Sequence, residues 1–291
     1  MAASDSSAAG RVLICMADNG QDPTECAVPW KILTDAGFAV DFATEKGAIP
    51  SADQLLVKDS LFKMVLVRAN YHLGTSCVLT IMLQGPKKTW TDIYHQMTDS
   101  APFKNPNSWS ADDFSFLPYD AVIFPGGHDK PIKSYLESDS LHAHLKQYWP
   151  LTKRASETSD PASGHRRVVG AICHGVLVPT FAGLLHDVET TTLPQWLEGT
   201  GQAIGALWGR GQYYRTYDKW TWQGVVGALK DPSQYKKGPM GPGAFAHTDP
   251  TYAYVSARWP ADAELFAQRI IEEVQTAKKE HATVPAVTTS S

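Results

Sequence analysis

Short apolar runs alternate with amphipathic segments along the first part of the chain. RVLICMA at 11–17 and FAVDFAT at 38–44 have the length and composition of buried strands. Between them, Asp22 and Pro23 open a segment in which apolar residues recur at helical spacing as far as Gly37. The order strand, helix, strand predicts a right-handed βαβ unit in a parallel sheet.

The same alternation returns in the middle of the chain. AVIFPGG, which starts at Ala121, predicts another strand, and a helix is expected over about 133–149. After a polar loop, VVGAI at 168–172 predicts a strand that runs directly into Cys173 and a further helix. The central part of the chain therefore continues the α/β pattern.

The C-terminal part closes the pattern with one more strand and helix. YAYVSA at 252–257 predicts the strand, and 261–279 is an amphipathic helical segment. We expect a single α/β domain over 11–280. The polar composition of 1–10 and 281–291 predicts disordered tails.

Two stretches do not fit a minimal doubly wound sheet. Residues 50–118 are polar and aromatic, and residues 194–247 are rich in Trp, Tyr and Gly. We interpret both as insertions over the carboxyl edge of the sheet, where such folds bind ligands. The most apolar long stretch, 61–83, contains too many charged and polar residues for a membrane span.

Composition narrows the possible functions. The chain is 43% hydrophobic and 19% charged with a net charge of −4, which is typical of a globular protein. Without a basic run, neither a nucleic acid nor a membrane is expected as a partner. The N-terminus lacks the pattern of a signal peptide. The cysteines show no CxxC spacing, which favours reduced thiols in a cytoplasmic protein over a zinc or disulfide framework; they are Cys15, Cys26, Cys77 and Cys173.

The chemistry concentrates where the strand at 168–172 meets Cys173. A nucleophile on a strand-to-helix turn is held above the sheet, as in the nucleophile elbow of hydrolases. The following helix N-terminus is expected to lower the pKa of the thiol and to stabilise an oxyanion. Gly175 permits close approach of backbone or substrate. A buried structural cysteine is the alternative, but the strand–Cys–His–Gly–helix context favours a nucleophile.

A glycine pair follows the strand that begins at Ala121. Gly126 and Gly127, with His128 after them, allow backbone N–H groups to point into a cleft. The N–H groups of Gly127 and His174 are candidates for an oxyanion hole. The alternative for the glycine pair is a plain turn.

Glu25 lies on the first helical turn after the first strand, at the same edge of the sheet as Cys173. A carboxyl group beside the cysteine can stay protonated and serve as acid or base. The alternative is a charge that interacts with the helix dipole.

Together these motifs resemble the ThiJ/PfpI superfamily, which is related to class I glutamine amidotransferases. The resemblance rests on ICHG after an apolar strand, PGGH upstream of it, and E-x-x-x-P from Glu25 to Pro29. PGGHD with an added internal segment is similar to the glyoxalase III and chaperone branch. The resemblance implies a flavodoxin-like sandwich, a mostly parallel sheet with helices on both faces, and frequent homodimers.

The resemblance also implies roles for individual residues. Cys173 corresponds to the nucleophile, His174 to a general base or orienting residue, and Glu25 to the carboxyl group that relays a proton. Members with a full triad use an acid beyond the elbow, for which Glu198 is the candidate. The alternatives are Asp187 and Glu189.

Aromatic residues of the second insertion are candidates for the wall of a large substrate site, although ordinary packing is the alternative. They are Trp196, Trp208, Tyr213 and Tyr214.

Three hypotheses follow for a small-molecule site without a cofactor. The first is a glyoxalase III-like lyase that converts a 2-oxoaldehyde into a 2-hydroxy acid. The second is a cysteine hydrolase or hydratase of a larger amide, ester or isonitrile. The third is a redox-sensing stress protein or holdase chaperone. No metal is expected, because the histidines lack a compact ligand spacing.

Overall fold

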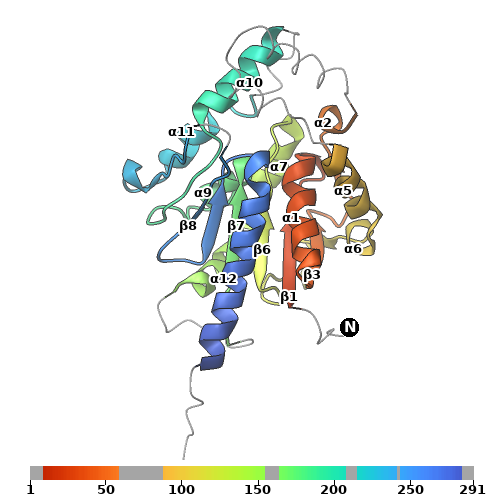
Figure 1. Cartoon of the computed structure of the whole chain (residues 1–291), viewed down its shortest axis with the longest axis vertical. Helices are drawn as coiled ribbons and strands as arrows, with labels where there is room; N and C mark the ends of the chain where they lie inside the picture. The colour runs from red at the N-terminus through yellow and green to blue at the C-terminus, as the bar shows by residue number, and fades with distance from the viewer. Residues whose placement is uncertain (1–8, 59–87, 155–163, 208–214, 241–242, 284–291) are drawn as a thin grey trace, which may run out of the picture.

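A central sheet of seven strands organises the fold, in the order β5-β3-β1-β6-β7-β9-β8 (Figure 1). The computed structural model describes residues 9–58, 88–154, 164–207, 215–240 and 243–283. All strand pairs are parallel except β8 with β9. The strands are β1 Gly10–Cys15, β3 Phe38–Thr44, β5 Asn107–Ser108, β6 Ala121–Phe124, β7 Val168–Ile172, β8 Ala246–Thr248 and β9 Tyr254–Ala257. The predicted flavodoxin-like class is confirmed.

Helices cover both faces of this sheet. Figure 1 shows α1 and α12 across the front and α7 and α9 behind. The front layer comprises α1 Pro23–Asp35, α5 Lys88–Asp99, α6 Ala101–Lys104 and α12 Ala263–Thr283; the rear layer comprises α7 Lys133–Leu136, α8 Asp139–Tyr148 and α9 Leu177–Phe181. Each layer packs its own apolar cluster against the sheet. Because both faces are covered, the central strands are apolar throughout rather than alternating.

The carboxyl ends of the parallel strands point towards the upper end of the molecule in Figure 1. A two-stranded sheet, β2 Asn19–Gln21 with β4 Ser51–Ala52, forms between the loops that follow β1 and β3. The other helices are α2 Gln54–Lys58, α10 Gln195–Leu207 and α11 Thr221–Val226. The 3-10 turns are η1 Lys130–Ile132, η2 Trp149–Thr152, η3 Cys173–Val176, η5 Pro232–Gln234 and η6 Pro260–Asp262.

The predicted helix over 133–149 is interrupted, which corrects the sequence-based expectation. It consists of α7 and α8, separated at Glu137 and Ser138. The Ser138 hydroxyl accepts a hydrogen bond from the backbone N–H of Leu141 at 3.3 Å and so begins a new helix. The sequence predicts one helix here because apolar residues recur on both sides of the break, whereas the break itself depends on the cap that Ser138 provides.

The described secondary structure extends slightly into both predicted tails. Strand β1 begins at Gly10, and α12 continues to Thr283. The backbone N–H of Ala9 also donates to the carbonyl of Gly37 at 2.9 Å. The element boundaries therefore differ from the predicted ones by a few residues, as is usual at helix and strand ends.

The two predicted insertions have different placements. Within 50–118, β4 and α2 lie at the carboxyl edge, whereas α5 and α6 pack against α1 and β3 and β5 widens the sheet. Within 194–247, α10 extends above the carboxyl edge and α11 packs against α9 (Figure 1). The stretch 61–83 lies outside the described residues.

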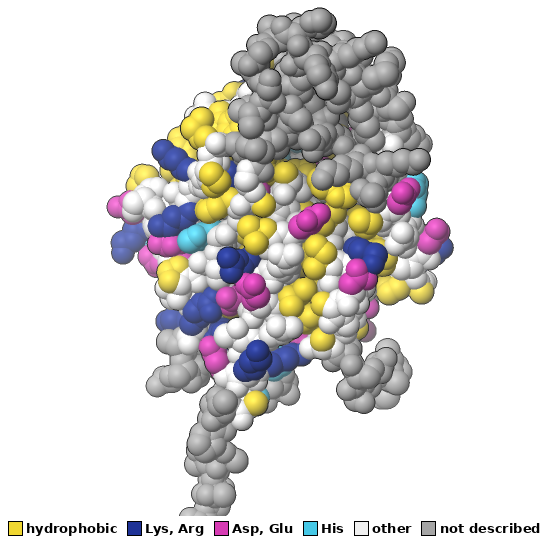
Figure 2. Space-filling view, in the orientation of Figure 1, with side chains coloured by type: hydrophobic (Ala, Val, Ile, Leu, Met, Phe, Trp, Pro, Cys, Tyr) yellow, Lys and Arg dark blue, Asp and Glu magenta, His cyan; other side chains and the backbone are white. Residues whose placement is uncertain are grey.

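The visible surface carries charges of both signs. On the face shown in Figure 2, Lys and Arg side chains are interspersed with Asp and Glu, and no single sign dominates. None of the described helices is long and apolar enough to cross a lipid bilayer.

Candidate active site

The turn between β7 and η3 places Cys173 in a strained backbone conformation. Its φ angle is 58°, the only positive φ of a non-glycine residue in the described part of the chain. Such a conformation costs about 1–3 kcal/mol and persists only where the surroundings impose it. A Cβ atom on Gly175 would collide with the carbonyl oxygen of Phe124. The end of β6 therefore packs directly against the turn and holds it in place.

Three predicted residues meet at this turn. The Sγ of Cys173 lies 3.5 Å from Nδ1 of His174. The opposite nitrogen of His174, Nε2, lies 3.8 Å from Oε1 of Glu198. The second oxygen of Glu198 accepts a hydrogen bond from the backbone N–H of Thr221 at 2.9 Å, which fixes the carboxyl group from α11. The structure thus aligns a thiol, an imidazole and a carboxyl group, all at most 4% exposed.

Glu25 approaches the same cysteine from the first turn of α1. Its Oε2 accepts a hydrogen bond from the backbone N–H of Gly126 at 2.8 Å, and its carboxyl group also interacts with the Cys173 thiol. The Glu25 side chain is fully buried. Gly126 has no room for a side chain, because a Cβ there would lie 2.6 Å from the backbone nitrogen of His174. Glu25, the glycine loop and the elbow are therefore in mutual contact.

Burial sets the protonation states of Glu25 and Cys173. Burial, and then the negative charge of Asp22, raises the pKa of Glu25 well above its usual range. Burial, followed by the nearby charges of Glu25 and Asp22, also raises the pKa of Cys173. In both groups burial therefore favours the neutral, protonated form.

The expected lowering of the thiol pKa by the helix N-terminus is therefore wrong. The turn that follows Cys173 is a short 3-10 turn, whose dipole is small. Desolvation of a thiol that is only 4% exposed outweighs it.

The two histidines are neutral as well. Burial, and then its neighbour His128, lowers the pKa of His174 to about 3. Burial lowers the pKa of His128 to about 4. Burial raises the pKa of Glu198 to about 7, although hydrogen bonds from Thr221 act in the opposite direction. At neutral pH the imidazole of His174 is therefore uncharged, and it lies next to the Glu198 carboxyl group, whose pKa is close to neutral.

The glycine pair is more constrained than a plain turn. The N–H of Gly126 is used by Glu25, and its carbonyl accepts a hydrogen bond from the N–H of Asp22 at 2.9 Å. Gly127 has a φ of 156°, and a Cβ there would lie 2.5 Å from the carbonyl oxygen of Gly20. Gly126 is therefore engaged with Glu25, whereas the N–H groups of Gly127 and His174 stay predicted donors to an oxyanion.

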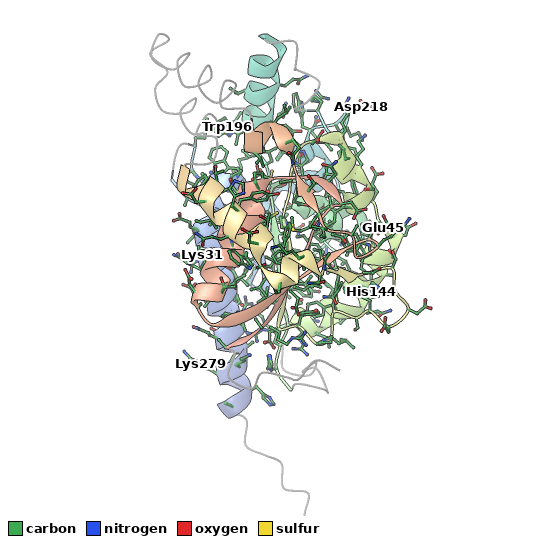
Figure 3. All side chains as sticks on the ribbon, turned by 90° about the vertical axis from the view of Figure 1, so that its right-hand side faces the viewer. Lys31, Glu45, His144, Trp196, Asp218 and Lys279 are labelled. Atoms are coloured by element: carbon green, nitrogen blue, oxygen red, sulfur yellow. The ribbon has the colours of Figure 1, made fainter. Side chains whose placement is uncertain are left out.

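Trp196 lies on α10, two residues before Glu198. It is half-buried and packs edge-on against Trp259, with 5.6 Å between ring centroids and 81° between planes. Figure 3 shows Trp196 at the upper end of the molecule, opposite Lys279. This contact with Trp259 fits the ordinary packing that is the alternative to substrate binding for Trp196. Trp208, Tyr213 and Tyr214 lie outside the described residues.

The alternative acids for the triad are engaged elsewhere. Asp187 is exposed and lies 3.1 Å from Nδ1 of His186. Glu189 forms ion pairs with Lys236 at 2.8 Å and with His247 at 3.0 Å. Of the three predicted acids, Glu198 is the one that the structure places beside His174.

Several residues that position the site carry no signal in the sequence. The hydroxyl of Thr192 donates to the carbonyl of Cys173 at 2.8 Å, and Thr221 holds Glu198. These contacts join residues 19 and 23 positions apart, so no local pattern predicts them. Asp22 has a sequence signal as a helix cap, but no sequence pattern indicates that its charge lies near the Glu25 carboxyl group.

His128 lies beside His174, and its backbone carbonyl accepts a hydrogen bond from the Thr216 hydroxyl at 2.9 Å. Across the described ranges of the chain, no three His, Cys, Asp or Glu side chains converge in a geometry suited to a metal ion.

A model of the family described as ThiJ/PfpI family-like matches residues 16–239, which include Glu25, the glycine pair, Cys173 and Glu198. The chain belongs to the ThiJ/PfpI-like family. Two uncharacterised proteins of Schizosaccharomyces pombe are similar along their sequences. One is 28% identical over 92% of this chain and 85% of its own length, and the other 25% identical over 87% and 74%.

Solved structures share the fold of this ThiJ/PfpI-like protein. Glyoxalase III from Candida albicans is 17% identical, with a TM-score of 0.57, over 91% of this chain and 97% of that one. The rapid encystment protein of 24 kDa from Francisella tularensis is 16% identical, with a TM-score of 0.54, over 91% and 99%. At these identities the likeness establishes the fold alone.

Proposed function

We propose that the protein is a cysteine-dependent glyoxalase III-like enzyme that converts a 2-oxoaldehyde and water into a 2-hydroxy acid. The observation that carries this proposal is the contact of the Cys173 thiol with two neutral proton-transfer groups, the Glu25 carboxyl and the His174 imidazole. An isomerisation between adjacent carbons needs one group that donates a proton and one that accepts it. The likeness to the C. albicans glyoxalase III fold supports the same reaction class.

The first step joins the thiol to the aldehyde. Sγ of Cys173 forms a bond to the aldehyde carbon, the C=O double bond becomes a single bond, and the thiol proton passes through His174 to the aldehyde oxygen. The product is a hemithioacetal. The N–H groups of Gly127 and His174 are the donors proposed to stabilise the developing oxyanion.

The second step moves hydrogen between the two carbons. His174 takes the proton of the former aldehyde carbon while the protonated Glu25 donates to the ketone oxygen, which yields an enediol. His174 then returns its proton to the former ketone carbon, and Glu25 recovers one from the other hydroxyl group. The result is a 2-hydroxy thioester, which water cleaves to the 2-hydroxy acid and the free thiol.

The test is a comparison of purified wild type and Cys173→Ala with glyoxal and methylglyoxal, without added thiol. We expect wild type to form lactate from methylglyoxal and Cys173→Ala to form none. Cys26→Ala is a matched control, because Cys26 is equally buried on α1. Lactate formation by Cys173→Ala at the wild-type rate would overturn the proposal.

A second candidate function is a cysteine hydrolase of a larger ester or amide. The alignment of Cys173, His174 and Glu198 favours it, because thiol–imidazole–carboxyl geometry also supports acyl transfer. A covalent acyl adduct on Cys173 with aryl esters, detected by mass spectrometry in an enzyme silent towards dicarbonyls, would favour this function.

A further inference from the structure

Asp22 contacts both the first turn of α1, which carries Glu25, and the glycine loop that follows β6. Its Oδ1 accepts hydrogen bonds from the backbone N–H groups of Thr24 at 2.8 Å and Glu25 at 3.1 Å. Its own N–H donates to the carbonyl of Gly126 at 2.9 Å. Because the N–H of Gly126 in turn donates to Glu25, Asp22 and Glu25 both hold this glycine. A shift of Asp22 would therefore move the Glu25 carboxyl relative to Cys173.

The neighbouring Gln21 makes this position rigid. Its Nε2 donates to the carbonyls of Pro125 at 2.6 Å and Gly126 at 2.9 Å. Its Oε1 accepts from the N–H of Ala17 at 2.7 Å. The segment before α1 is thereby fastened both to the end of β1 and to the glycine loop, so the orientation of Asp22 follows from the fold.

Asp22 is also a charge beside a second buried acid. Burial raises its pKa to about 6, while the N–H groups of Glu25 and Thr24 favour its charged form. At pH 7 and above it is therefore an anion. Two neighbouring buried carboxyl groups cannot easily both ionise, so the pair retains one proton, which lies on Glu25.

Other titratable groups face this pair, but they do not replace Asp22. The charge of Asp262 also raises the pKa of Glu25, but this carboxylate forms an ion pair with Arg258, whose Nε lies 2.8 Å from Oδ2. Cys173, Cys26 and Tyr135 are buried with raised pKa values and are neutral at pH 7, and burial raises the pKa of Asp53 to about 7. Among the described residues, Asp22 forms no ion pair.

We propose that Asp22 is a positioning residue of the active site: its carboxyl group caps the turn that carries Glu25, holds that turn against the glycine loop, and places a like charge beside the Glu25 carboxyl. This inference rests on the proposed function for its catalytic meaning. The contacts and charges on which it is based involve Glu25 and Cys173, and they do not depend on the substrate.

The test uses Asp22→Asn, since asparagine preserves a helix-capping oxygen and removes only the charge. Asp22→Ser is a second replacement that keeps a cap. The matched control is Asp35→Asn, at the exposed opposite end of the same helix. The first readout is the rate of Cys173 alkylation by iodoacetamide at pH 8, followed by peptide mass spectrometry, and it needs no substrate. The second is the pH profile of kcat/KM for methylglyoxal.

Removal of the like charge should lower the pKa of the Cys173 thiol, and we expect alkylation at pH 8 to become about tenfold faster. It should also move the loss of activity at high pH, where Glu25 loses its proton, about one unit lower. The Asp35→Asn control should match wild type in both. Unchanged alkylation and an unchanged profile in both Asp22 variants, with only a lower melting temperature, would overturn the inference. If wild type forms no lactate but Cys173 is alkylated faster in the Asp22 variants than in wild type, the proposed function is overturned and the inference stands.

Discussion

Individual protonation states decide what Glu25, His174 and Glu198 can do. A carboxylic acid keeps its proton when it is buried among other acids, and an imidazole stays neutral when it is fully enclosed. Glu25 satisfies the first condition and His174 the second. The fold therefore brings a carboxyl group that favours its protonated form and a neutral imidazole to the same sulfur, which are the donor and the acceptor that the proposed reaction needs.

Replacement of the acid by its amide separates chemistry from packing. In Glu25→Gln, the amide oxygen can still accept from Gly126, but the transferable proton is lost. We expect kcat for methylglyoxal to fall about 10²–10⁴-fold, with a melting temperature close to that of wild type. Glu264→Gln, on an exposed first turn of α12, is the control. Retained activity in Glu25→Gln would assign the proton transfer to His174 alone.

Glu198 should impose a pH dependence near neutrality. Its pKa of about 7 means that it becomes an anion as the pH rises through that value, and only the anion stabilises a protonated His174. We expect kcat/KM of wild type to rise through about pH 7 and Glu198→Gln to lose this step. Glu189→Gln, which removes an acid paired with Lys236 and His247, should keep the step. An identical profile in Glu198→Gln and wild type would contradict this role.

Among the elements, the β7–η3 turn depends on close contact with β6. The strained φ of Cys173 is maintained because the ends of both strands are buried and hydrogen-bonded side by side. The turn carries Cys173 and His174 together, so any displacement changes both at once. Its integrity therefore depends on the absence of a side chain at Gly175.

A methyl group at Gly175 tests this contact. Gly175→Ala would drive Cβ into the carbonyl of Phe124, and we expect a loss of about 1–3 kcal/mol in the free energy of unfolding, measured by urea titration. Activity should also fall under conditions in which the variant is still fully folded, because the turn carries both Cys173 and His174. Gly199→Ala is the control, since its Cβ would lie 3.7 Å from the nearest atom, in a helix that alanine favours. Equal stability of Gly175→Ala and wild type would contradict the tight packing.

Across the whole molecule, Asp120 ties the amino end of the sheet together. Its carboxyl group accepts hydrogen bonds from the Arg11 backbone at 2.8 Å, His165 at 2.7 Å, Arg167 at 3.2 Å and Lys278 at 3.0 Å. These partners come from β1, the segment before β7, and α12. Burial raises its pKa, but these interactions outweigh burial and lower the pKa below the ordinary 3.8.

This carboxyl group should make the fold sensitive to acid. Since its pKa is lower in the folded than in the unfolded chain, its stabilisation is fully present above about pH 4 and is lost as the pH falls below it. We expect Asp120→Asn to lose about 2–4 kcal/mol of unfolding free energy at pH 7 and to show a weaker further loss towards pH 3. Asp112→Asn, at an exposed position, is the control. Parallel acid denaturation of Asp120→Asn and wild type would contradict this assignment.

The strands and the elbow could be predicted because their signals are local. Apolar runs long enough for a buried strand, the cap at Asp22 and the stop at Gly37 all act within a few residues. The break between α7 and α8 was missed because it depends on the cap that one serine provides, with apolar residues on both sides of it. The antiparallel edge strand β8 was missed as well, because three half-buried residues carry no strand pattern.

Residue types and their order along the chain were enough to indicate an α/β sheet with a cysteine at the end of a strand, because periodicity and turn chemistry are properties of neighbouring residues. Tertiary structure decided the rest. It placed Glu198 rather than Asp187 or Glu189 beside His174, and it raised the thiol pKa that a helix N-terminus was expected to lower. Both outcomes depend on burial and on distances between segments far apart in the chain, which no local pattern encodes.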